Sequence, residues 1–401
     1  MSRVPRTVWI LSLVSLLTDT ASEMLYPVMP VYLRSIGFSV LLIGVLEGIA
    51  EATAGLSKGY FGKQSDLSGK RIPFVQWGYA LSSISKPMMA LFTYPLWIFL
   101  ARTTDRIGKG LRTGARDAML SDAATPETKG RIFGFHRSMD TIGAALGPSI
   151  ALVYLYYFPE NYITLFLIAF IPGALAVATS LLLKEQKKFR VTPVKQSAFF
   201  SFLGYWKQSP AAYRKLATGL LLFTLVNSSD VFLLMKAKEA GLSNTLVIGV
   251  YIFYNLVYAL FAFPVGIIAD KLGLKKIFLA GLILFSVVYL GMSINTSLPG
   301  FLLLFLLYGI YAAATEGISK AWISNISQKK DIATAIGTYT GLQSICTMLA
   351  SSITGLLWYK LGNSAAFVLT GLATIGIFIY MLQVPDPKHH EPDETPGITD
   401  R

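Results

Sequence analysis

The chain consists largely of long apolar segments that recur along its whole length. Twelve can be distinguished, each near the roughly 20 residues that a helix needs to cross a bilayer. They lie at 7–33, 40–61, 73–93, 95–116, 131–157, 162–183, 213–236, 244–268, 276–295, 299–323, 332–358 and 364–383. Because lipid offers no hydrogen-bond partners to the backbone, such segments cross it as helices. We therefore expect an all-α membrane protein with twelve transmembrane helices.

The composition excludes several classes of protein. Only 14% of the residues are charged and 53% are hydrophobic, whereas soluble domains carry about 25% charged residues. A soluble enzyme, a disordered chain and a nucleic-acid-binding domain are therefore excluded. Cys346 is the single cysteine, so an intrachain disulfide is impossible. The chain has no phosphate-binding loop, zinc-protease motif or nucleophile elbow, so we expect neither an enzyme nor a bound cofactor or metal.

The distribution of cations predicts the orientation in the membrane. The net charge is +13, and most Lys and Arg lie near the termini, in the middle of the chain and in alternate connections. The opposite loops hold only Arg34, Lys236, Lys238 and Lys360. Cationic loops stay in the cytoplasm, which predicts a multi-pass protein of the cytoplasmic (inner) membrane with both termini cytoplasmic. The positive charge then faces anionic lipid headgroups rather than nucleic acid.

A polar stretch near the middle predicts the domain organisation. It separates an N-terminal six-helix bundle, residues 1–183, from a C-terminal one, residues 213–384. The stretch itself, 184–212, mixes aromatic and basic residues, which indicates a cytoplasmic linker with a short interfacial helix or else a flexible connection. The proline-rich and acidic tail, 385–401, is typical of disorder.

The two halves share an internal repeat. The segment Gly62–Arg71 and the segment Gly266–Lys276 both contain Gly, Asp four residues later, Gly three residues beyond and then paired cations. Thr104-Asp105 is matched by Thr315-Glu316, and Ser22-Glu23 by Ser229-Asp230, at nearly the same offset. A nearly constant offset indicates two homologous halves, an organisation that places a substrate site between them at the membrane midplane.

These residues make the chain resemble the major facilitator superfamily over about residues 7–384. Gly62, Asp66, Gly69 and Arg71 match the loop signature of that superfamily, and Asp270 belongs to its second copy. Arg102 corresponds to the arginine of the span-four motif. Gly143, Gly147 and Pro148 resemble the glycine-proline motif of antiporter-type exporters, although its closing Gly-Gly is replaced here. The resemblance implies two pseudo-symmetric six-helix bundles, and we expect a monomer.

Charged side chains recur inside the expected spans, mostly in the first half. Each costs at least about 2.5–3.5 kcal/mol at bilayer depth, so it needs a partner or a function. Asp19/Glu23 and Glu47/Glu51 are spaced four residues apart, so each pair shares a helix face. Carboxylates side by side in a low dielectric do not readily ionise together, so they can exchange protons. Since spans one, four, seven and ten line the cavity in the superfamily, we predict a substrate and proton cavity with Asp19, Glu23, Glu47, Glu51, Lys86, Arg102, Asp105, Arg106, Lys109, Asp230, Glu316 and Lys320.

Two further interpretations concern the same charges. Asp105 with Lys109, and Glu316 with Lys320, are also spaced to neutralise each other within one helix, which is the alternative to a cavity role. A cytoplasmic gate, as opposed to a plain solvated loop, is predicted from the charged and glycine residues near the cytoplasmic span ends, namely Gly62, Asp66, Gly69, Arg71, Arg112, Arg116, Asp117, Arg137, Asp140 and Asp270.

The sequence therefore predicts a secondary active transporter that moves a small solute or ion by alternating access. The span-five motif and the intramembrane carboxylates favour proton-coupled efflux by antiport. An uptake symporter, or an exporter of a divalent metal cation bound by the same oxygen ligands, is the alternative within transport. A membrane receptor on a transporter frame is the alternative of another class. The substrate itself is not indicated by any motif.

Overall fold

Helices form the described part of the chain, which comprises residues 4–26, 28–38, 40–185 and 198–385 of a computed structural model. Side chains are described for these residues except 30, 31, 34, 40–52, 244, 245 and 248. All but the first residue of the expected tail 385–401, and residues 186–197 of the expected linker, lie outside the described residues.

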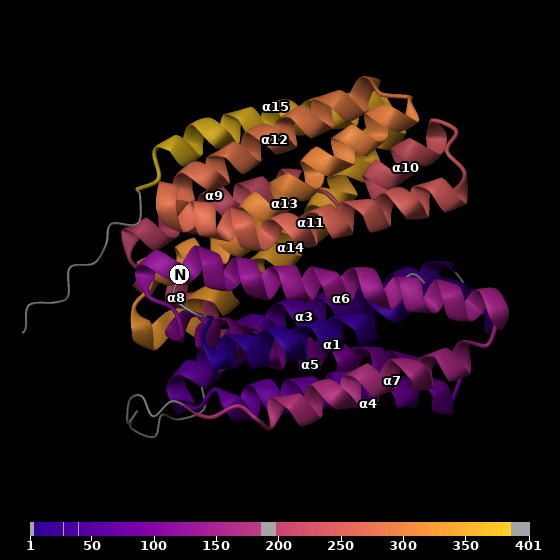
Figure 1. The fold of residues 1–401 in the computed structure, drawn as a ribbon, viewed down its shortest axis with the longest axis horizontal. Helices are drawn as coiled ribbons and strands as arrows, with labels where there is room; N and C mark the ends of the chain where they lie inside the picture. Colours follow the sequence, from indigo (N-terminus) through magenta and orange to yellow (C-terminus); the bar gives the residue numbers. More distant parts are fainter. Residues whose placement is uncertain (1–3, 27, 39, 186–197, 386–401) are drawn as a thin grey trace, which may run out of the picture.

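The first half contains seven α-helices in the described residues, and a short 3-10 turn, η1 (Pro126–Thr128), precedes the sixth. They are α1 (Arg6–Leu25), α2 (Met29–Ser35), α3 (Val40–Ser68), α4 (Ile72–Leu91), α5 (Pro95–Asp122), α6 (Lys129–Tyr157) and α7 (Tyr162–Ser180). In Figure 1 they lie in the lower part of the molecule, with α4 and α7 outermost.

The second half repeats this layout in the upper part of Figure 1. Its helices are α9 (Ala211–Val226), α10 (Val231–Glu239), α11 (Asn244–Leu272), α12 (Leu274–Ile294), α13 (Leu298–Ile326), α14 (Ile332–Leu361) and α15 (Asn363–Leu382), with the turn η3 (Lys329–Asp331) before α14. Between the halves, η2 (Phe199–Gly204) and α8 (Tyr205–Gln208) form a short helical connection.

The first expected span of each half is broken. The expected span 7–33 is divided between α1 and α2 around residues 26–28, and the expected span 213–236 between α9 and α10 around Asn227–Asp230. In the sequence, Pro27 stands between Leu25 and Met29, and proline lacks a backbone donor. The second break contains Asn, Ser and Asp, whose side chains compete with helical hydrogen bonds. These two breaks occupy equivalent places in the two halves.

In the described residues, nine helical segments are long and apolar enough to cross a membrane. The remaining long helices, α3, α4 and α5, are not among the nine. In α5 the reason is its many Arg, Lys and Asp residues, several of which are buried. The first part of α3 lies among the residues whose side chains are not described, so the count of nine covers only the described residues.

Glycines allow the two halves to approach closely along two pairs of helices. Gly62 on α3 lies against the backbone of Ala333 and Gly337 on α14, leaving no room for a Cβ atom. Gly130 on α6 lies in the same way against Gly266 on α11. Both approaches lie at the end of the bundle where the described chain begins and ends, the left-hand side of Figure 1. We call this the termini end.

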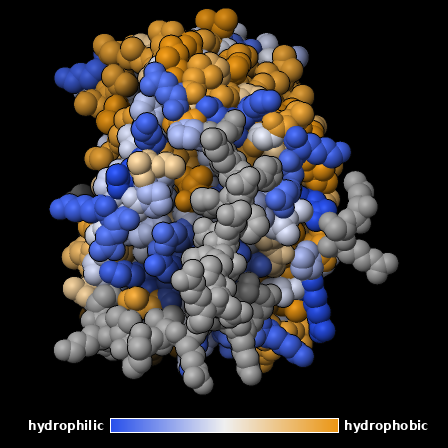
Figure 2. All heavy atoms as spheres, turned by 90° about the vertical axis from the view of Figure 1, so that its left-hand side faces the viewer, coloured by the Kyte–Doolittle hydropathy of each residue, from blue (hydrophilic) through white to orange (hydrophobic). Residues whose placement is uncertain are grey.

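The connections beside these approaches are tight because glycine permits left-handed backbone. Gly69 joins α3 to α4 with φ +64°, and Gly273 joins α11 to α12 with φ +103°. A residue with a Cβ atom is strained at such φ values. Figure 2 looks onto the termini end, where hydrophilic residues gather across the surface, while hydrophobic residues dominate the upper part of the view.

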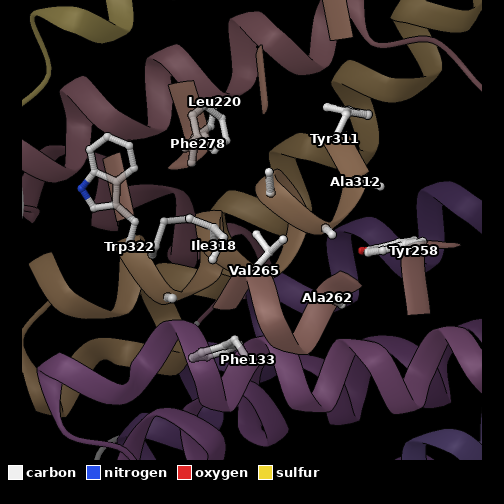
Figure 3. Packing of buried hydrophobic residues seen from close by; sticks show 14 of the residues in the cluster. Phe133, Leu220, Tyr258, Ala262, Val265, Phe278, Tyr311, Ala312, Ile318 and Trp322 are labelled. Carbon is white, nitrogen blue, oxygen red and sulfur yellow. The ribbon is translucent and has the colours of Figure 1, made fainter. Parts of the chain in front are cut away.

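Apolar and aromatic side chains pack between α6 of the first half and the helices of the second. Phe133 of α6 is buried and belongs to the same cluster as Val265 on α11 and Ile318 on α13 (Figure 3). Trp322 and Phe278 lie deeper in the second half, with ring centroids 6.1 Å apart. This contact is continuous with the core of the second half.

Candidate functional site

A large cavity lies between the two halves. Its volume is about 1360 Å³, which exceeds the 300–1,000 Å³ of common small-molecule pockets. Its walls come from the ends of α1, α6 and α11 that lie away from the termini end, from the end of α9 and the start of α10, from Phe278 of α12, and from the middle of α13 and α14. The two broken helices therefore both border the cavity.

Among the described residues, three carboxylates line this cavity. They are Glu23 on α1, Asp230 at the start of α10 and Glu316 on α13. Glu23 and Asp230 are the pair that the sequence repeat relates, and they come from the two broken helices. Asp230 accepts a hydrogen bond of 2.6 Å from the hydroxyl of Tyr308. Glu316 is the most accessible of the three, with 46% of its side chain exposed.

A chain of polar contacts begins beneath the cavity at Asp117 of α5. Lys320 of α13 donates to its Oδ2 at 2.8 Å, and the neighbouring Arg116 pairs with its Oδ1 at 2.9 Å. Arg116 also donates to the hydroxyl of Ser15 on α1 at 3.0 Å. Asp117 is thus buried between one cation of each half, and the contact with Lys320 joins the halves.

The series of polar contacts continues from Ser15 to the second contact between the halves. Ser15 donates to Asp140 of α6 at 2.8 Å, and Arg137 donates to the other oxygen of that carboxylate at 2.7 Å. Arg137 in turn pairs with Glu316 and donates to the hydroxyl of Tyr258. Because Glu316 and Lys320 are one helical turn apart on α13, the contacts close into a ring. We call the ring the polar circuit; its members are Ser15, Arg116, Asp117, Arg137, Asp140, Glu316 and Lys320.

Asp19 adjoins the polar circuit. It lies beside Asp140, and the two carboxyl groups interact directly. Two carboxylates this close repel each other when both are ionised. Asp19 also packs against Gly143 of α6, and Gly147 lies against the backbone of α1 one turn further along. These two glycines of the predicted antiporter-like motif thus hold α1 and α6 together, and Pro148 lines the cavity.

A second group of charges is sealed inside the first half. Lys86 of α4 pairs with Asp105 of α5 at 2.7 Å, and only 2% of the Lys86 side chain is exposed. Ser22 of α1 accepts a further bond from Lys86 at 3.1 Å. Arg112, predicted as a gate residue, donates to Ser82 at 2.6 Å within the same half. Neither Lys86 nor Asp105 lines the cavity.

Two carboxylates at the termini end bind the first turns of helices in the opposite half. Asp66 of α3 accepts from the backbone N–H and the hydroxyl of Thr334 on α14, at 2.6 and 2.7 Å, and pairs with Arg71 at 2.7 Å. Asp270 of α11 accepts from the backbone N–H groups of Gly130 and Arg131 on α6, at 2.7 and 2.8 Å. A helix N-terminus attracts negative charge. We call these contacts the two latches; they close the termini end.

The structure thus divides the predicted cavity residues into groups. Glu23, Asp230 and Glu316 line the cavity. Lys320 belongs to the polar circuit and Asp19 adjoins it, while Arg106 and Lys109 act electrostatically on Glu23. Arg102 is buried close to the sealed Lys86–Asp105 pair. The side chains of Glu47 and Glu51 lie outside the described residues.

The intrahelical alternative does not describe these ion pairs. Asp105 pairs with Lys86 rather than Lys109, and Glu316 pairs with Arg137 while Lys320 pairs with Asp117.

In the part of the chain that the structure describes, no group of three His, Cys, Asp or Glu side chains is placed to hold a metal ion.

Several residues of these contacts were not predicted from the sequence. Ser15 lies four residues before Asp19 on the same helix face, and Tyr308 lies eight residues before Glu316, so helical spacing could have indicated both. Thr334 stands in the first turn of α14, where a helix N-terminus offers unpaired N–H groups. The aromatic residues along the cavity carry no comparable signal, because tyrosine is common throughout the spans.

Comparison with known sequences identifies relatives over the whole chain. The profile of the Major Facilitator Superfamily matches residues 11–257 and 231–400. The uncharacterized MFS-type transporter MJ1317 of Methanocaldococcus jannaschii is 33% identical over 376 residues, which is 92% of each chain. The uncharacterized protein Rv2265 of Mycobacterium tuberculosis is 30% identical over 182 residues, 45% of this chain and 44% of that protein.

Solved structures show the same fold at low sequence identity. The human organic anion transporter MFSD10 superposes with a TM-score of 0.77 at 17% identity, covering 95% of this chain and all of that one. The Escherichia coli fucose:proton symporter FucP gives 0.74 at 12% identity, covering 94% and 98%. The proton:xylose symporter XylE gives 0.73 at 16% identity, covering 96% of each chain.

Proposed function

The chain belongs to the major facilitator superfamily, and we propose that this secondary transporter expels a small solute from the cell in exchange for protons. The termini end is then the cytoplasmic side of the inner membrane, and the chain works as a monomer of two bundles joined by the linker. In the described conformation the latches close the cytoplasmic side, and the cavity faces the opposite side.

The observation that carries this proposal is the link between the cavity and the carboxyl pair of the first half. Glu316 is accessible from the cavity and pairs with Arg137, which also holds Asp140 beside Asp19. A proton that reaches Glu316 from the cavity removes one charge of its pair with Arg137. The freed guanidinium then favours ionised Asp140, and the contact between the halves weakens.

This link couples protons to the opening of the cytoplasmic side. Weakening the Arg137–Glu316 contact removes one of the two places where the polar circuit joins the halves. The halves can then separate at the termini end, where a solute enters the cavity from the cytoplasm. Because a carboxylate holds either a proton or a cationic group, arrival of the solute favours proton release, which is the requirement for antiport.

Uptake by proton symport is the second candidate, since FucP and XylE share the fold and their names describe proton symporters. The two candidates differ in the direction of solute movement under one gradient. An acid exterior drives solute out of liposomes through an antiporter and into them through a symporter.

The test uses purified chain in liposomes and a solute that raises its Tm in a thermal-shift screen of drugs, sugars and metal ions. Liposomes are loaded with the solute, and the exterior is then acidified. Antiport predicts solute loss with entry of protons, measured with a pH-sensitive dye inside. If solute instead accumulates inside the liposomes while protons enter, the result contradicts antiport and supports symport.

Variants test the route of coupling. We expect Glu316→Gln and Arg137→Gln each to lower proton-driven efflux at least tenfold, and the double variant to be no slower than the worse single one, because contacting residues act as a unit. Solute exchange without a pH gradient should continue in both. Glu160→Gln, in the exposed loop between α6 and α7, is the matched control and should transport like the wild type. Unchanged proton-driven efflux in both single variants would contradict the role of this pair.

A further inference from the structure

The charged side chains that line the cavity all carry one sign. Among the described lining residues, Glu23, Asp230 and Glu316 are acidic, and none is Lys, Arg or His. Glu316 is balanced by Arg137, and Glu23 is within reach of Lys109 and Arg106. The cavity therefore presents an excess of negative charge to whatever enters it.

Asp230 is the carboxylate whose charge is least balanced. Its hydrogen-bond partner is the neutral hydroxyl of Tyr308, and no cation of the described residues forms an ion pair with it. The charged groups that act on it are Glu316 and Arg137, which pair with each other. A carboxylate at bilayer depth needs a counter-charge, and the cavity is where one can arrive.

Aromatic rings form much of the wall of the cavity that Asp230 lines. Phe223, Tyr251, Phe278, Tyr311 and Tyr339 line the cavity from the second half, and Tyr26, Tyr156 and Tyr157 line it from the first. Tyr311 lies 5.2 Å from Tyr308 between ring centroids. Aromatic faces attract cations and bury flat apolar groups. A wall of this kind beside a carboxylate suits a cation with a bulky apolar body.

We propose that the solute is a monovalent organic cation of drug-like size, bound with its charged centre at Asp230 and its apolar body against the aromatic wall. The inference rests on the proposed function, because it concerns the same cavity. The volume of about 1360 Å³ accommodates such a molecule with some water. An organic anion would meet carboxylates without a lining cation, and a sugar would leave Asp230 without a counter-charge.

The test compares three probes of similar aromatic bulk and different charge. Tetraphenylphosphonium is a cation, triphenylphosphine oxide is neutral and tetraphenylborate is an anion. Their binding to the full chain in lipid nanodiscs is measured by equilibrium dialysis without any pH gradient, and nanodiscs lacking protein correct for partition into lipid. We expect saturable binding of the cation, at least tenfold tighter than that of either other probe.

Variants of Asp230 locate the charged centre. A hydrogen-bonded or paired charge contributes roughly 1.5–3 kcal/mol, so Asp230→Asn should weaken tetraphenylphosphonium binding about 10- to 100-fold. Asp230→Glu keeps the charge and should restore most of the affinity, and Glu160→Gln removes a carboxylate outside the cavity and should change nothing. Circular dichroism confirms that each variant is folded.

Each outcome decides the inference. Absence of cation binding, equal or tighter binding of the neutral or anionic probe, or full affinity in Asp230→Asn would each overturn it. Failure of the proposed function gives a different result. Tetraphenylphosphonium would then still bind through Asp230, but the purified chain in weak buffer would release no protons when it binds. Binding accompanied by proton release supports both.

Discussion

Lys86 and Asp105 fill the space between α4 and α5, the third and fourth long helices of the first half, with a sealed ion pair. The helices at the same places in the second half, α12 and α13, enclose aromatic rings instead. Phe285 stacks on Tyr289 at 4.1 Å between centroids and lies 4.9 Å from Tyr311. One layout therefore supports two kinds of interior, charged in the first half and aromatic in the second.

This difference suggests a division of roles. Charged groups change their contacts when protons bind, whereas aromatic rings offer surface without changing charge. The carboxyl pair Asp19–Asp140 and the larger part of the polar circuit belong to the first half. Asp230 and most of the aromatic residues that line the cavity belong to the second. Three experiments, each on its own part of the molecule, can break or sharpen the comparison.

The largest effect is expected from the sealed ion pair. Lys86→Met leaves the Asp105 charge buried without its partner, which destabilises a protein by about 3–5 kcal/mol. Removing both charges in Lys86→Met with Asp105→Leu should restore much of that loss. Phe285→Met, a size-conserving change between α12 and α13, should cost less than about 1.5 kcal/mol. Unfolding of the purified chain in mixed micelles measures all three, and a larger loss for Phe285→Met than for Lys86→Met would refute the comparison.

A smaller effect is expected at the two latches. Asp66→Ala loses the bonds from Thr334 and the pair with Arg71, whereas Asp270→Ala loses two backbone N–H bonds. Since a hydrogen bond to a charged group contributes about 1.5–3 kcal/mol, both variants should raise the population that is open at the termini end, and Asp66→Ala should raise it more.

Distances between spin labels measure that population. The labels are placed on cysteines at the exposed positions Ser68 and Lys330, in a chain that carries Cys346→Ser. Longer distances should become more populated in the order wild type, Asp270→Ala, Asp66→Ala. An unchanged distribution in Asp66→Ala would show that the latch does not hold the termini end closed.

The smallest effect is expected on the aromatic wall. Tyr311→Leu removes a ring that a cation can contact, and such contacts contribute about 0.5–2 kcal/mol. Tetraphenylphosphonium should therefore bind severalfold more weakly, whereas Tyr311→Phe keeps the ring and should retain the affinity although it loses the hydrogen bond from Asn227. Equal affinities of the Leu and Phe variants in equilibrium dialysis would argue against ring contact.

Much of the fold could be predicted from the sequence, because lipid restricts a spanning chain to few structures. The apolar segments gave the helices, and the repeated glycine and aspartate positions gave the two related halves. The breaks near residues 27 and 228 were missed. Their signals, Pro27 and the run Asn227-Ser228-Ser229, stand inside apolar surroundings that favour a continuous helix by composition.

The site could be predicted only in part. The internal repeat indicated Glu23, Asp230 and Glu316, and helical spacing shows which residues share a face. It does not show which neighbouring helix a face meets. The four-residue spacing therefore suggested an ion pair between Asp105 and Lys109 as the alternative, whereas Asp105 pairs with Lys86 on α4. The contact between Lys320 and Asp117 joins residues 203 positions apart, which no local pattern reveals.

The positions of Glu316 and Lys320 on α13 also determine how abruptly the halves can part. The two side chains are one turn apart on a single rigid helix, and both polar-circuit contacts between the halves pass through them. A rotation or axial slide of α13 displaces both side chains together, so a movement that breaks one contact also strains the other. Under the proposed function, the loss of the Arg137–Glu316 contact would therefore also favour the loss of the Lys320–Asp117 contact.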